Sequence, residues 1–92
     1  MAKLLMFHGR ECPHCKVMLP LVETLEKETG VVFDKYEVWH DEKNADLMRS
    51  FRSVLGPKCG GQLRVPAFLN TETKDARCGE MSYEDLKAWA SA

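Results

Sequence analysis

Apolar residues occur along this chain in two patterns, short continuous runs and stripes repeated at helical spacing. Runs rich in apolar, β-branched and aromatic residues fill segments 3–8, 31–39 and 64–70. Runs of this length and composition are typical of strands. A turn over 71–74 precedes the shorter segment 75–78, which we predict as a fourth strand.

Helical spacing is found in three other stretches. The first begins at Pro13, which suits a first helical turn, and ends at Gly30, a common C-terminal cap. The second follows Asp41 and is predicted to end at Gly56–Pro57, and the third follows Ser82. Asp41 and Ser82 both have side-chain oxygens that can cap a helix. The apolar stripes of the three stretches are formed by Val17, Met18, Leu21, Val22 and Leu25, by Ala45, Leu47, Met48, Phe51, Val54 and Leu55, and by Leu86 and Trp89.

The resulting order is β-α-β-α-β-β-α, an α/β fold. A strand–helix–strand unit of this kind is right-handed with parallel strands, whereas the tight turn before 75–78 predicts an antiparallel hairpin. We therefore expect a four-stranded mixed sheet flanked by three helices. With 92 residues and no linker or repeat, the chain is expected to form a single domain spanning residues 1–92.

Composition and charge exclude several classes of function. Thirteen Lys and Arg against fourteen Asp and Glu give a net charge of -1, which provides no basic footprint for nucleic acid. No apolar run is long enough to cross a bilayer, and the first eight residues are too short for a secretory signal. These observations favour a cytoplasmic monomer without membrane contact.

The spacing of two cysteines carries the strongest chemical signal. Cys12 and Cys15 form a Cys-x-x-Cys motif at the junction between a predicted strand and a predicted helix. A helix N-terminus presents unpaired N–H groups that stabilise a thiolate. We expect Cys12, in the capping position, to be the exposed nucleophile, and Cys15, one turn on and partly covered, to resolve its mixed disulfides.

The two residues inside the motif modify this chemistry. Pro13 starts the helix, and a protonated His14 beside a thiolate would favour the anion and make the disulfide a stronger oxidant. The simpler alternative is that His14 is an exposed helix residue. A second alternative makes the motif half of a zinc site completed by Cys59 and Cys78, although structural zinc sites more often use two compact cysteine pairs.

Several motifs resemble those of the thioredoxin superfamily over nearly the whole chain. They are Cys12-Pro13-His14-Cys15-Lys16, Pro20 five residues after the second cysteine, and Val65-Pro66 before a strand. The short layout is glutaredoxin-like, and the Pro-His dipeptide is similar to that of DsbA-type oxidants. The resemblance implies that Pro66 is a cis-proline beside the active site. It also implies that Val65 offers its backbone to a substrate peptide or to glutathione.

The sequence also departs from the family pattern. Thioredoxins place a buried aspartate six residues before the nucleophile, where this chain has Met6, so Glu11 or a water would have to help deprotonate Cys15. Glutaredoxins carry a Gly-Gly-Asp-like run that holds glutathione. The matching stretch here is Cys78-Gly79-Glu80, which leaves Gly79 as a candidate binding residue, and Arg10 is a candidate partner for a glutathione carboxylate.

Three interpretations remain open for Cys59 and Cys78. They are unreactive thiols, or they form a second disulfide with each other, or one of them exchanges electrons with the first pair. Sequence does not decide between these because pairing depends on the separation of the Cα atoms. Trp39 and Trp89 are expected to lie partly in the core, and His8 is expected to be structural rather than part of the site.

The motif and the resemblance together predict a thiol–disulfide oxidoreductase, an enzyme that transfers electrons through a reversible Cys12–Cys15 disulfide. Its expected partners are protein disulfides and a reductant, either glutathione or a reductase. No metal or organic cofactor is required, and glutathione is an alternative co-substrate. The competing hypothesis is a cysteine-based module that binds metal or senses redox state without turnover.

Overall fold

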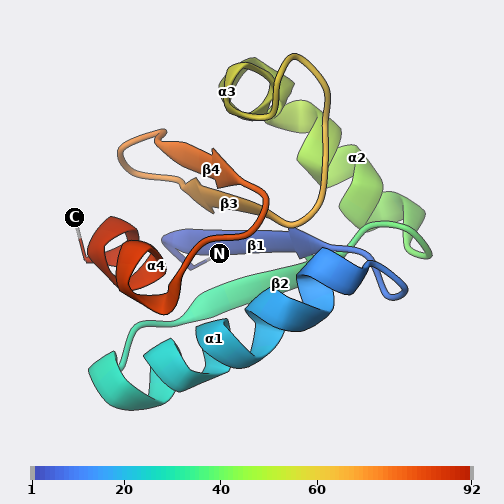
Figure 1. Cartoon of the computed structure of the whole chain (residues 1–92). Coiled ribbons are helices and arrows are strands. Elements are labelled where there is room, and N and C mark those ends of the chain that lie inside the picture. Colours follow the sequence, from blue (N-terminus) through green and yellow to red (C-terminus); the bar gives the residue numbers. More distant parts are fainter. Residues whose placement is uncertain (1, 92) are drawn as a thin grey trace.

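The computed structural model describes residues 2–91, which form four strands and four helices around one mixed sheet (Figure 1). The elements, in chain order, are β1 (Leu4–His8), α1 (Pro13–Thr29), β2 (Phe33–Glu37), α2 (Glu42–Ser50), α3 (Arg52–Lys58), β3 (Ala67–Asn70), β4 (Ala76–Cys78) and α4 (Tyr83–Ala90).

The sheet has the strand order β2-β1-β3-β4. β1 is parallel to β2, with Leu4 opposite Phe33, and β3 is antiparallel to both β1 and β4. The predicted parallel unit and antiparallel hairpin are therefore confirmed. The observed strands are shorter than the predicted ones because only part of each apolar run pairs with a neighbour.

The helices cover both faces of the sheet, α1 and α4 on one side and α2 and α3 on the other (Figure 1). The central strand β1 alternates between the two layers, as a strand must. Leu4 and Met6 pack with α1 and α4, whereas Leu5 and Phe7 pack toward α2 and α3. Each fully buried side chain of this size contributes roughly 1.5–3 kcal/mol to folding, so β1 anchors both halves of the core.

The predicted helix ends are confirmed by their capping bonds. Asp41 accepts a hydrogen bond from the N–H of Asn44 at 3.2 Å, and Ser82 accepts one from that of Asp85 at 3.1 Å. Gly30 ends α1 with φ 77°, a left-handed conformation that favours glycine.

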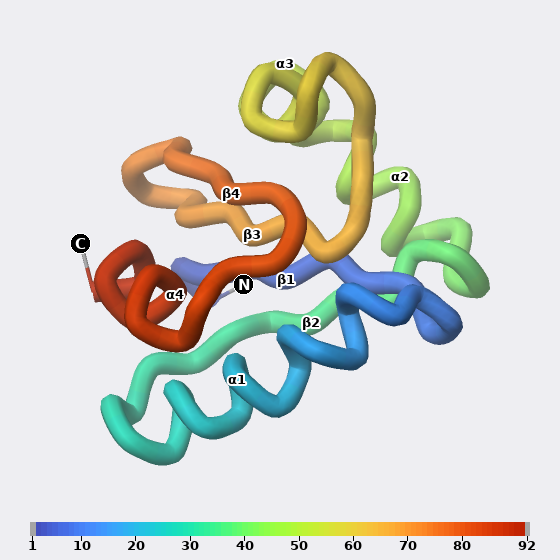
Figure 2. The backbone as a smooth tube through the Cα atoms, in the orientation of Figure 1, coloured from blue at the N-terminus to red at the C-terminus, as the bar shows by residue number. Residues whose placement is uncertain are grey.

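The prediction of a single helix after Asp41 is wrong, because that segment forms two helices. The break is at Phe51, whose backbone leaves helical geometry at φ -102° and ψ 16° and whose ring lies 6.5 Å from that of Phe7. Pro57 lies inside the last turn of α3 rather than after it, and Lys58 is the last helical residue. The bend directs α3 across the sheet to β4, as the tube in Figure 2 shows.

The two tryptophans differ in exposure. Trp39 is 52% exposed, so its expected place in the core is wrong, while Trp89 is buried as expected. The ring of Trp39 lies directly over Gly9, where any Cβ atom would collide with it.

Within residues 2–91, no helix is both long and apolar enough to cross a membrane.

Candidate redox site

The Cys-x-x-Cys motif begins α1, with Cys12 as its N-cap. The N–H of Cys12 donates to the carbonyl of Gly9 at 3.1 Å, which closes the turn after β1. The sulfur of Cys12 then accepts a hydrogen bond from the N–H of Cys15 at 3.3 Å. Cys12 Sγ is thus held at the positive end of the α1 dipole, an arrangement that stabilises negative charge on sulfur.

Cys12 is nevertheless only 4% exposed, so the prediction of an exposed nucleophile is wrong. The S–H of Cys12 faces the carbonyl oxygen of Val65 at 3.8 Å. The segment before β3 therefore lies against the sulfur, a tertiary contact that the motif itself does not specify. This contact accounts for the low exposure of Cys12.

Cys15 is fully buried one turn into the helix, more deeply than predicted. The N–H of Gly9 donates to its sulfur at 3.5 Å. Burial, followed by the interaction with Cys12, raises the pKa of Cys15 to about 12. Cys15 is therefore a protonated thiol near neutral pH.

This difference predicts selective alkylation of the reduced protein. Near pH 8 we expect iodoacetamide to modify Cys12 at least about tenfold faster than Cys15, because only the thiolate reacts. The Cys15 rate should rise about tenfold per pH unit up to its raised pKa of about 12, since the thiolate fraction grows in that proportion. Mass spectrometry of the peptides measures both rates. In denaturant, Cys15 should titrate near its ordinary value, and a Cys15 rate independent of pH in the folded protein would contradict this assignment.

Glu11, the proposed proton acceptor for Cys15, is engaged elsewhere. Its two carboxylate oxygens lie 2.7 Å and 2.8 Å from Nε2 of His40 at the protein surface. This hydrogen bond lowers the pKa of the Glu11 carboxyl. Met6 is fully buried on β1, so this strand position supplies no carboxylate either.

The bond between Val65 and Pro66 is cis, as the resemblance implied. Across from it, the N–H of Gly79 donates to the carbonyl of Pro66 at 2.8 Å, and Gly79 has φ 88°. The structure therefore brings Val65, Pro66 and Gly79 together, and Val65 contacts Cys12. All three are candidate substrate-binding residues from the sequence.

A cleft of about 490 Å³ lies beside these residues. His14 from the start of α1 faces it, together with Pro66 and Gly79. Its remaining wall comes from the end of α3, the segment before β3 and the loop after β4, through Lys58, Cys59, Gly60, Arg64, Val65, Cys78 and Glu80.

Arg10 does not line this cleft, contrary to the role expected for it. Its backbone N–H donates to Glu37 at 2.8 Å, which places the loop on the β2 side of Cys12. The basic residues of the cleft are instead Lys58 and Arg64. Sequence reasoning missed both because neither lies within forty residues of the motif.

The sequence also offers no sign that the carboxylate of Glu80 pairs with Nδ1 of His14, a contact across 66 residues of sequence. Both side chains are exposed at the cleft. The contact fixes where the imidazole of His14 lies, which distinguishes it from a freely solvated helix residue.

Cys59 and Cys78 form a disulfide, with their Cα atoms 5.3 Å apart. This result selects one of the three interpretations left open by the sequence. It also excludes the zinc site with four cysteine ligands, because two of its ligands are bonded to each other. Among residues 2–91, no group of three or more His, Cys, Asp or Glu side chains is placed to hold a metal ion.

The sheet order, the cis-proline and the cysteine pair at the N-terminus of α1 define a glutaredoxin-like thioredoxin fold. The chain is similar to a glutaredoxin from Archaeoglobus fulgidus, known from its crystal structure. The two share 26% sequence identity with a TM-score of 0.65, over 96% of this chain and 85% of that one. Neither the comparison with protein-family models nor that with curated proteins gives a match.

Proposed function

We propose that this protein is a thiol–disulfide oxidoreductase in which Cys12 is the nucleophile and Cys15 resolves. The observation that carries the proposal is the Cys12 sulfur, which accepts the N–H of Cys15 at the N-terminus of α1. A cysteine stabilised there as a thiolate can attack a substrate disulfide. The glutaredoxin-like fold supports the same reaction class.

The proposed reaction consists of two successive thiol–disulfide exchanges. The Cys12 thiolate attacks one sulfur of the substrate disulfide, forms a mixed disulfide and releases the other substrate sulfur as a thiolate. Cys15 then loses its proton and attacks Cys12, which releases the second substrate thiolate and leaves a Cys12–Cys15 disulfide. The pKa of Cys15, raised to about 12 in the reduced protein, makes this second step depend on a base.

The substrate is expected to lie along the segment 64–66. The carbonyl of Val65 already accepts from Cys12 at 3.8 Å, so an extended peptide paired with Val65 would present its disulfide to that sulfur. Protein disulfides and glutathione disulfide both fit this requirement. Glutathione or a protein reductase would restore the dithiol.

Catalysis of insulin reduction by dithiothreitol tests the function. We expect catalytic amounts of the protein to accelerate precipitation of the insulin B chain over dithiothreitol alone. A protein that reacts stoichiometrically at Cys12 but gives no acceleration would instead be a redox sensor without turnover. Titration against glutathione buffers then measures the reduction potential of the Cys12–Cys15 pair.

His14 is expected to tune that potential. Its imidazole is held by Glu80 at the cleft, so a positive charge there would stabilise the reduced thiolate form. We predict that His14→Gln shifts the equilibrium with glutathione toward the disulfide by about tenfold, equivalent to about 30 mV. Glu80→Gln should change the reduction potential less than His14→Gln does. An unchanged potential in His14→Gln would show that the ring does not act on the thiolate.

A further inference from the structure

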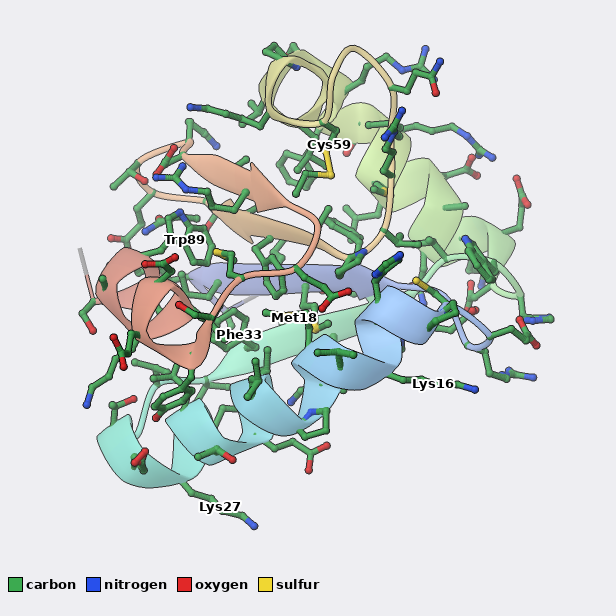
Figure 3. All side chains as sticks on the ribbon, in the orientation of Figure 1. Lys16, Met18, Lys27, Phe33, Cys59 and Trp89 are labelled. Atoms are coloured by element: carbon green, nitrogen blue, oxygen red, sulfur yellow. A yellow bond between two sulfur atoms is a disulfide. The ribbon has the colours of Figure 1, made fainter. Side chains whose placement is uncertain are left out.

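The segment before β3 contacts two different sulfur centres. Its carbonyl at Val65 faces Cys12 Sγ at 3.8 Å, and the preceding carbonyl, of Arg64, lies 3.7 Å from Cys78 Sγ. Figure 3 shows the disulfide of Cys59 between α3 and the hairpin of β3 and β4. The proposed function uses only the first of these centres.

The two residues of the Cys59–Cys78 disulfide differ in exposure. Cys59 is 5% exposed, whereas Cys78 is only partly buried and both residues line the cleft. Thiol–disulfide exchange requires the attacking thiolate to reach one sulfur. A thiol within the cleft would therefore meet Cys78 first and displace Cys59.

The charges of the cleft select the kind of thiol. Lys58 and Arg64 line it, and both are exposed. Lys58 has a distant partner, Asp75, at 3.9 Å, and Arg64 forms no ion pair within the described range 2–91. The one carboxylate in the lining, Glu80, is paired with His14. This imbalance attracts an anion.

We propose that Cys59–Cys78 is a second redox-active disulfide, opened by a small anionic thiol that enters the cleft. The protein would then exchange two electron pairs, one at Cys12–Cys15 and one at Cys59–Cys78. A redox role for Cys12–Cys15 rests on the proposed function, whereas a redox role for Cys59–Cys78 does not. A carboxylate- or sulfonate-bearing thiol is the expected class of reductant.

The exchange is balanced as follows. A thiolate RS⁻ attacks Cys78 Sγ, which forms an RS–Cys78 bond and breaks the bond to Cys59, leaving Cys59 as a thiolate. A second RS⁻ attacks the sulfur of R, forms RSSR and releases Cys78 as a thiolate. The two protein thiolates take up two protons. Two thiols are thus oxidised to one disulfide while one protein disulfide is reduced.

The test compares three probe thiols on a Cys12→Ser/Cys15→Ser variant, which removes the first pair. The probes are 2-mercaptoethanesulfonate, 2-mercaptoethanol and cysteamine, and opening is followed by alkylation and mass spectrometry under native conditions. With rates corrected for thiolate fraction and basicity, we expect the sulfonate to react about three- to tenfold faster than 2-mercaptoethanol and cysteamine to be the slowest. Added salt should reduce these differences.

Matched arginine variants locate the effect. Arg64→Gln should remove most of the preference for the sulfonate, and Arg52→Gln, an exposed arginine on α3 outside the cleft, should retain it. Should the double cysteine variant fold poorly, peptide-level mass spectrometry of the wild-type protein follows the same disulfide separately from Cys12 and Cys15.

Two results would overturn the proposal. One is a Cys59–Cys78 bond that opens only after denaturation, and the other is an opening rate set by thiolate concentration regardless of probe charge. The first result would leave the bond a structural link, and the second would show that the cleft does not select an anionic thiol. Insulin reduction by a Cys59→Ala/Cys78→Ala variant separates the two sites, because that activity tests Cys12 and Cys15 alone.

Discussion

A Cys12→Ser variant is expected to lose disulfide reductase activity by at least about two orders of magnitude. A serine hydroxyl keeps its proton near neutral pH and forms no disulfide, so the helix N-terminus has no anion to stabilise. Insulin reduction by dithiothreitol provides the measurement. The substitution replaces one small buried side chain by another, so far-ultraviolet circular dichroism should remain that of the wild-type protein.

Two further variants make this test specific. Cys15→Ser should still attack substrate but accumulate a mixed disulfide on Cys12, visible as an added mass that dithiothreitol removes. Val17→Ser changes an exposed residue of the same helix and should retain full activity. Turnover by Cys12→Ser at the wild-type rate would show that another group is the nucleophile.

Features governed by short-range interactions were predictable from the sequence. The caps at Asp41 and Ser82 depend on a side chain and an N–H three residues later, and both are present. The apolar run of β1 forms a buried strand that contributes to both core layers, and the stripe of α1 lies in one of them except for Val17, which is exposed. The position of Cys12 at the N-cap follows from the same local pattern.

The remaining features of the site depend on contacts distant in sequence. Cys12 is buried because a segment more than fifty residues away lies over its sulfur. Glu80 reaches His14 only because the loop after β4 runs past the start of α1. Arg10 lies near the motif in sequence but toward β2, whereas Arg64 is distant in sequence and lines the cleft. Periodicity and motif spacing contain no information of this kind.

The break at Phe51 shows how packing overrides a local pattern. The apolar spacing of residues 45–55 fits one continuous helix, yet the chain bends so that Phe51 packs near Phe7 and α3 reaches β4. The bend also carries Cys59, the C-cap of α3, to within bonding distance of Cys78. The covalent link between α3 and β4 is therefore a consequence of a break that the sequence pattern does not reveal.

Removing that link should have the largest effect on stability. Cys59 and Cys78 are 19 residues apart, and a cross-link closing a loop of this size restricts the unfolded chain by about 3 kcal/mol. The free energy of unfolding of a Cys59→Ala/Cys78→Ala variant, measured by urea denaturation, should therefore be about 3 kcal/mol lower. Its melting temperature should fall by roughly 15 °C. The comparison is best made in a Cys12→Ser background, where no second disulfide forms. A reductant should lower the stability of the Cys12→Ser protein to nearly that of the protein that also carries Cys59→Ala/Cys78→Ala. The stability of the latter should not change. A loss below about 1 kcal/mol would mean that Cys59 and Cys78 already lie close together in the unfolded chain. The disulfide would then restrict that chain only slightly.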